Sequence, residues 1–145
     1  MYWDRQKPIE QDLTKVDKIL KHGIRRVVVI AMDSNSSSTT CNDTTTNNRG
    51  KQLGEYIISE RLHIMNEPSK KKTFENRIGK SNIDLTLATN NVLRRITDWS
   101  ISDEESNSDH SIISYAIKTT NNHKNNTNTV ERKFRVNSVI TQKYK

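Results

Sequence analysis

A run of six consecutive apolar residues, Val27–Met32, is the feature that most constrains the fold of this chain. The run is continuous, short and rich in β-branched side chains, which predicts a β-strand buried on both faces. A strand of this kind is stable only where a packed layer covers its apolar surface. The remaining segments must therefore supply the covering elements.

Two helices and several short strands are predicted around this run. Residues 8–22 start with Pro8, which suits the first position of a helix, and Gly23 suits its end. Residues 49–62 also carry apolar side chains at helical spacing, although Gly54 lowers the helix propensity. Short strands are expected at residues 62–66, 73–76, 82–88, 96–101 and 110–118, with one more short piece at 131–136. This order predicts a mixed α/β body.

The composition allows only a small core. Hydrophobic residues make up 31% of the chain, against roughly 45–50% apolar residues in average proteins. Asn, Ser and Thr together number 45 of the 145 residues, and these short polar side chains favour loops and turns. No window approaches the roughly 18 apolar residues of a spanning helix, so we expect no membrane partner.

Cysteine usage points to an intracellular protein. The chain has a single cysteine, Cys41, which excludes an intramolecular disulfide and favours a reducing compartment. No base lies near Cys41 in the sequence, so we expect a free thiol and not a nucleophile. The first ten residues, MYWDRQKPIE, lack the apolar segment of a signal peptide.

The positive charge is concentrated at the C-terminal end. The whole chain carries a net charge of +7, of which residues 118–145 contribute +6 and the first 117 residues +1. Residues 119–129 consist mostly of Asn and Thr, which predicts disorder or a linker. Residues 119–145 therefore form either a solvated linker or a basic tail that suits a polyanionic partner.

Four polar residues stand where chemistry is expected. Asp33 and Asn35 directly follow the apolar run, where α/β sheets place ligand groups, although an ordinary turn uses the same residue types. Asp84 lies inside an apolar strand, where a carboxylate is costly unless it is paired or ligated, so it is a candidate partner for His110. Asp109 is a poor candidate for orienting its neighbour His110, because adjacent strand residues point to opposite faces.

Together these segments resemble the endonuclease/exonuclease/phosphatase superfamily, and most closely the AP-endonuclease-like domain of non-LTR retrotransposons. The resemblance covers residues 1–118 through VVVIAMDSNSSSTT, NNRGKQLGEYI, LHIMNEPSKKKTFENRIGKSNIDLTLA and ITDWSISDEESNSDHSIISYAI. It implies that residues 1–118 form the C-terminal part of a four-layer α/β sandwich like that of DNase I. The family's N-terminal half, with its Asn and metal-binding Glu, precedes the matched region.

The resemblance also implies a role for each candidate residue. Asp33 matches the residue that orients or deprotonates the attacking water, and Asn35 matches the amide that holds the scissile phosphate. His110 matches the imidazole that stabilises the phosphorane-like charge, and Asp84 the carboxylate that orients it. Asp109 matches a carboxylate of a divalent-metal site, and oxygen ligands of this kind suit Mg²⁺ or Mn²⁺.

Further residues are expected at the DNA-binding face. Tyr2 matches a tyrosine that contacts phosphate. Phe74 is expected either to pack in the core or to wedge at a groove, and Trp99 is expected in the core. Basic side chains flank Phe74 and either contact phosphates or form a solvated turn: Lys70, Lys71, Lys72, Arg77 and Lys80.

The resemblance predicts a metal-dependent, DNA-nicking endonuclease domain that precedes a reverse transcriptase in the full-length element. Such a protein would act on DNA in the nucleus. Because the metal-binding Glu belongs to the preceding region, we expect residues 1–145 alone not to be a competent nuclease. The alternative is a non-catalytic remnant with at most non-specific nucleic-acid binding, and a phosphatase acting on small substrates is a weaker reading.

Overall fold

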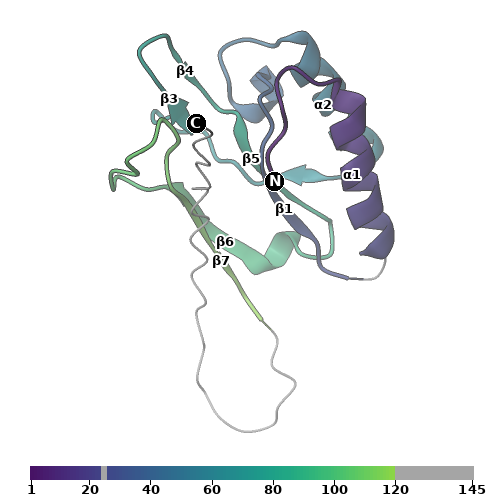
Figure 1. Ribbon diagram of the computed structural model, residues 1–145. Helices are drawn as coiled ribbons and strands as arrows, with labels where there is room; N and C mark the ends of the chain where they lie inside the picture. The colour runs from purple at the N-terminus through teal and green to yellow at the C-terminus, as the bar shows by residue number, and fades with distance from the viewer. Residues whose placement is uncertain (24–25, 120–145) are drawn as a thin grey trace, which may run out of the picture.

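The structure is a computed structural model that describes residues 1–23 and 26–119. The predicted element at 131–136 and the predicted linker beyond Thr119 lie outside the described residues. Figure 1 shows the elements, which follow one another along the chain in this order: α1 (Ile9–His22), β1 (Val29–Asp33), η1 (Thr39–Cys41), α2 (Asn48–Ser59), β2 (His63–Ile64), β3 (Phe74–Glu75), β4 (Lys80–Ser81), β5 (Asp84–Ala88), η2 (Leu93–Arg95), β6 (Ile96–Ile101) and β7 (Ile113–Ile117).

Both predicted helices and all the predicted strands within the described residues are present. Helix α1 ends where Gly23 donates its backbone N–H to the carbonyl of Ile19 at 2.8 Å. Helix α2 begins after Asn47, whose side-chain oxygen accepts the backbone N–H of Gly50 at 2.7 Å and so caps the helix. Strand β4 was not predicted, because Lys80 and Ser81 have no β-propensity and the hairpin with β3 alone defines it.

A three-stranded antiparallel sheet in the order β1-β5-β2 forms the centre of the fold. Helices α1 and α2 cover one face, where the larger apolar cluster lies; its buried members include Trp3, Val16, Leu53, Leu85 and Leu87. Next to the sheet, β6 and β7 form a separate two-stranded sheet. A second cluster joins the end of β5 to this hairpin, through Ala88, Val92, Ile96, Tyr115 and Ile117.

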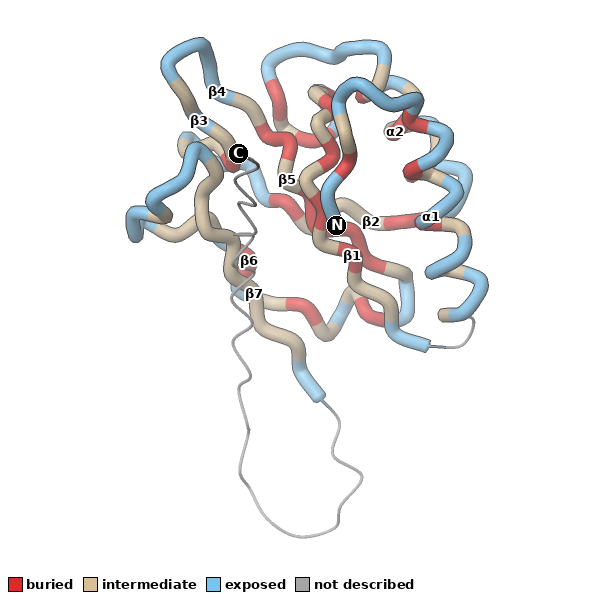
Figure 2. Tube along the Cα trace, viewed as in Figure 1, coloured by how far each residue is buried: buried red, intermediate tan, exposed pale blue. Residues whose placement is uncertain are grey.

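The expectation that the Val27–Met32 run is buried on both faces is wrong for β1. Ile30 and Met32 are buried, whereas Val29 and Ala31 are only partly covered. The reason is that the two faces of β1 have different cover: Ile30 and Met32 pack in the larger cluster, whereas Val29 is a partly buried neighbour of the smaller cluster. Strand β5 is the one buried on both faces, with Leu85–Ala88 all buried (Figure 2). Among the described residues no helix is both long and apolar enough to cross a membrane.

Candidate active site

The register of β1 and β5 brings two carboxylates together. Asp33 lies directly opposite Asp84 in the antiparallel pair. One residue further on, Ser34 donates its backbone N–H to the carbonyl of Ile83 at 2.8 Å. Asp33 and Asp84 therefore form a non-hydrogen-bonded pair, the arrangement in which opposite side chains of two strands approach most closely.

His110 completes the group from the loop that precedes β7. Its Nδ1 lies 2.9 Å from Oδ2 and 3.1 Å from Oδ1 of Asp84, so Nδ1 is the protonated nitrogen that donates to this carboxylate. Its Nε2 lies 3.9 Å from Oδ2 of Asp33. Phe74 packs edge-on against the imidazole, with ring centroids 4.9 Å apart. The structure thus brings Asp33, Asp84 and His110 together, as expected for the Asp84–His110 pair.

Electrostatics favour a proton within this group. The pKa of His110 is raised, chiefly by its hydrogen bond to Asp84 and also by the negative charges of Asp84, Asp33 and Asp109, while burial opposes the rise. The pKa of Asp33 is also raised, first by burial and then by the negative charge of Asp84. Both shifts favour the protonated forms, which suits groups that accept a proton during a reaction.

The Asp84→Asn variant should lower the pKa of His110, because it removes the carboxylate that stabilises the imidazolium. A histidine with a raised pKa adds stability that is full below its unfolded pKa of about 6.5 and is lost as the pH rises through the folded value. The His110 contribution to the free energy of unfolding should therefore shrink across that window. NMR titration of His110, and urea unfolding of the wild type and His110→Gln at several pH values, measure both effects. An unchanged His110 pKa in Asp84→Asn would contradict this assignment.

Asn35 is held beside Asp33 by a tight turn. Its φ angle of 46° places it in the left-handed region, which Asn adopts more readily than most residues. Its backbone N–H donates to Oδ1 of Asp33 at 3.1 Å, and its Nδ2 donates to the carbonyl of Trp3 at 2.9 Å. Asn35 therefore lies in a turn and can also belong to the candidate site, because the turn itself places Asn35 next to Asp33.

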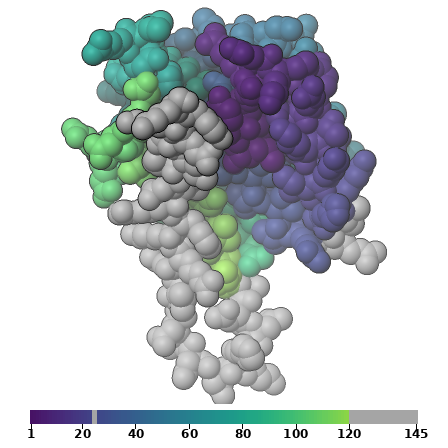
Figure 3. Space-filling view, in the orientation of Figure 1, coloured from purple at the N-terminus to yellow at the C-terminus, as the bar shows by residue number. Residues whose placement is uncertain are grey.

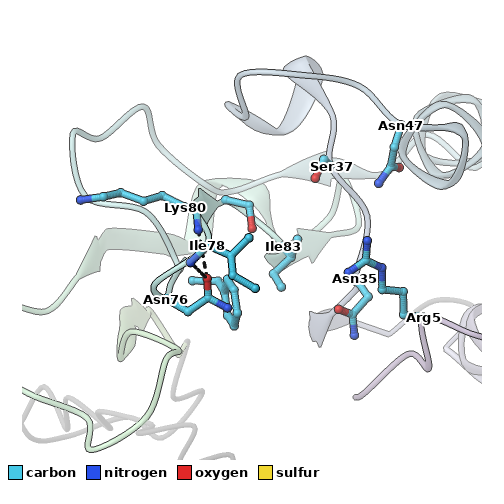
Figure 4. A pocket seen from close by; sticks show the side chains of 11 residues that line it. Arg5, Asn35, Ser37, Asn47, Asn76, Ile78, Lys80 and Ile83 are labelled. Carbon is cyan, nitrogen blue, oxygen red and sulfur yellow. Dashed lines mark hydrogen bonds between the residues drawn. The ribbon is translucent and has the colours of Figure 1, made fainter.

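A cavity of about 320 Å³ opens beside Asn35. Figure 4 shows its two walls: Arg5, Asn35, Ser37 and Asn47 on one side, and Asn76, Ile78, Lys80 and Ile83 on the other. Phe74, which contacts His110, also lines it. The space-filling view places the N-terminal segment and the β3–β4 region on the same face of the molecule (Figure 3). The cavity is therefore an open recess between these two segments and next to the Asp33–Asp84–His110 group.

The remaining residues singled out from the sequence differ in their exposure. Asp109 is exposed and precedes His110 in the sequence. Within the described residues, the side chains of Asp109 and His110 form no hydrogen bond with each other. Tyr2 is 67% exposed and its backbone forms a parallel bridge with Asp33. Trp99 is buried and donates Nε1 to Oγ1 of Thr86 at 3.1 Å, which confirms its place in the core. Cys41 is a buried free thiol, and burial raises its pKa to about 11.

The basic residues around Phe74 differ in their partners and exposure. Lys71 donates to the carbonyl of Ser102, and Lys72 donates to the carbonyl of Asn42 at 2.7 Å. Lys80 forms an ion pair with Glu75 at 2.7 Å. Lys70 and Arg77 are exposed. DNA contact by these five residues stays a prediction, and the internal bonds of Lys71 and Lys72 favour a structural role for those two.

Two residues that sequence reasoning missed hold the backbone of Asp84. The N–H of Asp84 donates to Oγ1 of Thr73 at 3.0 Å, and Nδ2 of Asn66 donates to the carbonyl of Asp84 at 2.9 Å. Both side chains are buried. In a chain so rich in Asn and Thr, no local signal distinguishes these two residues from the others of their type.

Similarity to known proteins places these observations in a family. A sequence profile of the endonuclease-reverse transcriptase family matches residues 1–114. The chain belongs to this family. It is 39% identical over 64 residues to a retrovirus-related Pol polyprotein from the type-1 retrotransposable element R1 of Bradysia coprophila, a match covering 44% of this chain and 6% of that protein. It is 26% identical to a putative 115 kDa protein in the element R1DM of Drosophila melanogaster, covering 78% of this chain and 12% of that protein.

A solved structure supports the family assignment at the level of the fold. The endonuclease domain of TRAS1, a telomere-specific non-LTR retrotransposon, superimposes with a TM-score of 0.73 at 31% identity. The match covers 80% of this chain and 52% of that domain, so the chain spans about half the length of the TRAS1 domain. The predicted α/β class and the resemblance to non-LTR retrotransposon endonuclease domains of the DNase I-like fold are confirmed.

Proposed function

We propose that this chain carries the water-activating and charge-stabilising part of a metal-dependent endonuclease site that nicks DNA. The observation that carries the proposal is the contact series Asp33–His110–Asp84, with Nε2 of His110 3.9 Å from Asp33 and Nδ1 2.9 Å from Asp84. Asn35 and the cavity adjoin this series. Phosphodiester hydrolysis needs an activated water and donors for the charge that develops on phosphate, and this arrangement offers both.

Each side chain has one task in this proposal. Asp33 accepts the proton of the attacking water, because its raised pKa makes it a better base than an ordinary carboxylate. His110 acts as the imidazolium, in which both ring nitrogens carry a proton, and donates a hydrogen bond from Nε2 to a phosphate oxygen as negative charge builds there. Asp84 fixes the imidazole by accepting from Nδ1 and supports its positive charge. Asn35 binds a second phosphate oxygen through its amide.

The residues present fit a divalent cation. Mg²⁺ and Mn²⁺ prefer oxygen ligands, and Asp33, Asp84 and Asp109 supply carboxylates in this region. Asp33, Asp84 and His110 could together hold an ion, since their ligand atoms all lie within 4.8 Å of one another. Asp109 is the better ligand, because its exposed carboxylate is not engaged with His110, whereas Asp84 already accepts from the imidazole. A bound cation supplies charge neutralisation at the phosphate.

The family supports a proposal for the substrate and the partner. One R1 relative is a Pol polyprotein, the other is a putative 115 kDa protein of a retrotransposable element, and the family bears the name endonuclease-reverse transcriptase. We infer that the substrate is DNA, that a reverse transcriptase domain belongs to the same element, and that action on chromosomal DNA takes place in the nucleus. The basic residues 119–145 would form the link between the domains or bind nucleic acid non-specifically.

A plasmid-nicking assay tests the proposal. Supercoiled DNA is incubated with residues 1–145, and with the same residues preceded by the N-terminal part of a related endonuclease domain, in Mg²⁺, in Mn²⁺ and in EDTA. We expect metal-dependent nicking by the extended protein and little by residues 1–145, because the latter offer Asp109 as the main metal carboxylate. Product gels measure the nicked fraction, and Asp33→Asn is the inactive control.

The alternative is a non-catalytic remnant that binds nucleic acid without cutting it. The uneven distribution of charge motivates this alternative, because residues 118–145 carry +6 of the net charge of +7. In that case neither protein nicks DNA in either metal, and both retain DNA in a gel-shift assay whose signal falls steeply with salt. Nicking that Asp33→Asn does not reduce would also reject the proposed site.

A further inference from the structure

The backbone of Asp84 lies where the neighbouring strand ends. Strand β2 pairs with β5 only at Leu87 and Ala88, and Met65 adds one more bond, from its N–H to the carbonyl of Thr86 at 2.8 Å. Beyond that point the regular ladder between β2 and β5 stops. The carbonyl of Asp84 and the N–H of Thr86 face this side of β5 and need partners, because buried backbone groups are costly when unpaired.

The carboxamide of Asn66 takes the place of the absent strand. Its Nδ2 donates to the carbonyl of Asp84 at 2.9 Å, and its Oδ1 accepts the N–H of Thr86 at 2.8 Å. One partner is an acceptor and the other a donor, so only one orientation of the amide satisfies both. Asn66 is 8% exposed, and its backbone carbonyl in turn accepts a hydrogen bond from Nδ2 of Asn42 at 3.0 Å.

This contact acts on the residue that orients His110. Asp84 is the first residue of β5, and its other backbone group donates to Thr73. A strand end held by side chains can shift more easily than one inside a ladder, and a displacement of about 1 Å at a catalytic group can cost about 10²-fold in rate. A side chain that pins the Asp84 peptide therefore controls how well its carboxylate meets Nδ1.

We propose that Asn66 is a positioning residue: its carboxamide locks the start of β5 so that the Asp84 carboxylate holds His110 in the Nδ1-protonated form. The effect of Asn66 on the nicking rate rests on the proposed nuclease function, whereas its effect on the Asp84 carboxylate and the His110 ring does not. No apolar side chain can replace Asn66, because none offers a donor and an acceptor at this spacing. The Asn66→Asp variant keeps the acceptor for the N–H of Thr86 but loses the donor to the carbonyl of Asp84.

The test uses the nitrogen signals of the His110 ring in residues 1–145, recorded by long-range ¹H–¹⁵N NMR at a pH where the ring is neutral. Wild type should show protonation at Nδ1. Asp84→Ala should show the mixture of Nδ1-protonated and Nε2-protonated tautomers that an unrestrained imidazole adopts. Asn66→Ala and Asn66→Asp should both move from the wild-type pattern toward that of Asp84→Ala. In the nicking assay, the same two variants should lower the single-turnover rate by about 10-fold or more, with DNA affinity within about twofold of the wild type.

Asn91→Ala is the matched control. Asn91 also donates its Nδ2 to a backbone carbonyl, that of Arg26 at 2.6 Å, and it lies beyond the other end of β5. Asn91→Ala should leave the ring-nitrogen signals of His110 unchanged.

A folded Asn66→Ala protein with the wild-type His110 signals overturns the proposal. If neither Asn66 variant folds, exchange of the Asn66 carboxamide protons in wild type decides: slow exchange supports the lock and free exchange overturns it. Absence of nicking by the N-terminally extended wild type would reject the nuclease function without touching the ring-nitrogen result.

Discussion

His110→Ala should slow the chemical step of DNA nicking by about 10²–10⁴-fold, the usual contribution of a positioned acid–base or charge-stabilising group. The imidazole is the side chain that contacts both carboxylates, at 2.9 Å from Asp84 and 3.9 Å from Asp33. DNA affinity should change little, because phosphate contacts elsewhere supply most of it. Single-turnover nicking by the N-terminally extended protein, at saturating enzyme, separates the rate from binding.

The matched control is His22→Ala. His22 is an exposed histidine in the last turn of α1 whose Nδ1 lies 2.7 Å from the carbonyl of Lys18, and its removal should leave the nicking rate unchanged. Asp84→Asn should act in the same direction as His110→Ala but more mildly, since it disturbs the imidazole without deleting it. If His110→Ala cut DNA at the wild-type rate, the site assignment would be wrong.

The sequence made Asp84 a candidate partner for His110, and the structure shows the two side chains in contact. A carboxylate among the apolar residues of β5 is costly unless it is paired or ligated, and His110 precedes the last predicted strand next to another carboxylate, Asp109. The position of Asp33 against Asp84 was not derivable in this way, because it depends on the antiparallel register of β1 and β5. Their position after the apolar run made Asp33 and Asn35 candidates, but an ordinary turn uses the same residue types, and the resemblance to a family supplied their roles.

Long-range backbone contacts explain what the sequence did not reveal. Asn66 and Thr73 matter because they end up beside the Asp84 peptide, and Lys71 and Lys72 bond to carbonyls from distant loops. None of these contacts leaves a periodic or compositional trace. The same holds for β1, whose apolar run predicted burial on both faces although only the face that carries Ile30 and Met32 packs in the larger cluster.

Gly50→Ala should lower the free energy of unfolding by about 1–3 kcal/mol, the usual range for inserting a carbon into a closely packed site. A Cβ on Gly50 would lie 1.8 Å from the carbonyl oxygen of Ser37 and 2.6 Å from its carbonyl carbon. These are backbone atoms, so no side-chain rotation relieves the overlap. The same oxygen accepts the N–H of Asn47 at 3.0 Å, which ties the start of α2 to the segment following Asn35. Urea unfolding measures the loss.

Gly54→Ala is the control in the same helix, because a Cβ there meets nothing within 4 Å. It should raise the free energy of unfolding by about 0.5–1 kcal/mol, since alanine is the better helix former. The opposite signs separate the close approach at Gly50 from helix propensity. Gly50→Ala should also slow nicking, because the Ser37 carbonyl must move and Asn35 lies two residues before it. A Gly50→Ala protein as stable as Gly54→Ala would show that α2 does not press on this segment, and the position of Asn35 would then need another cause.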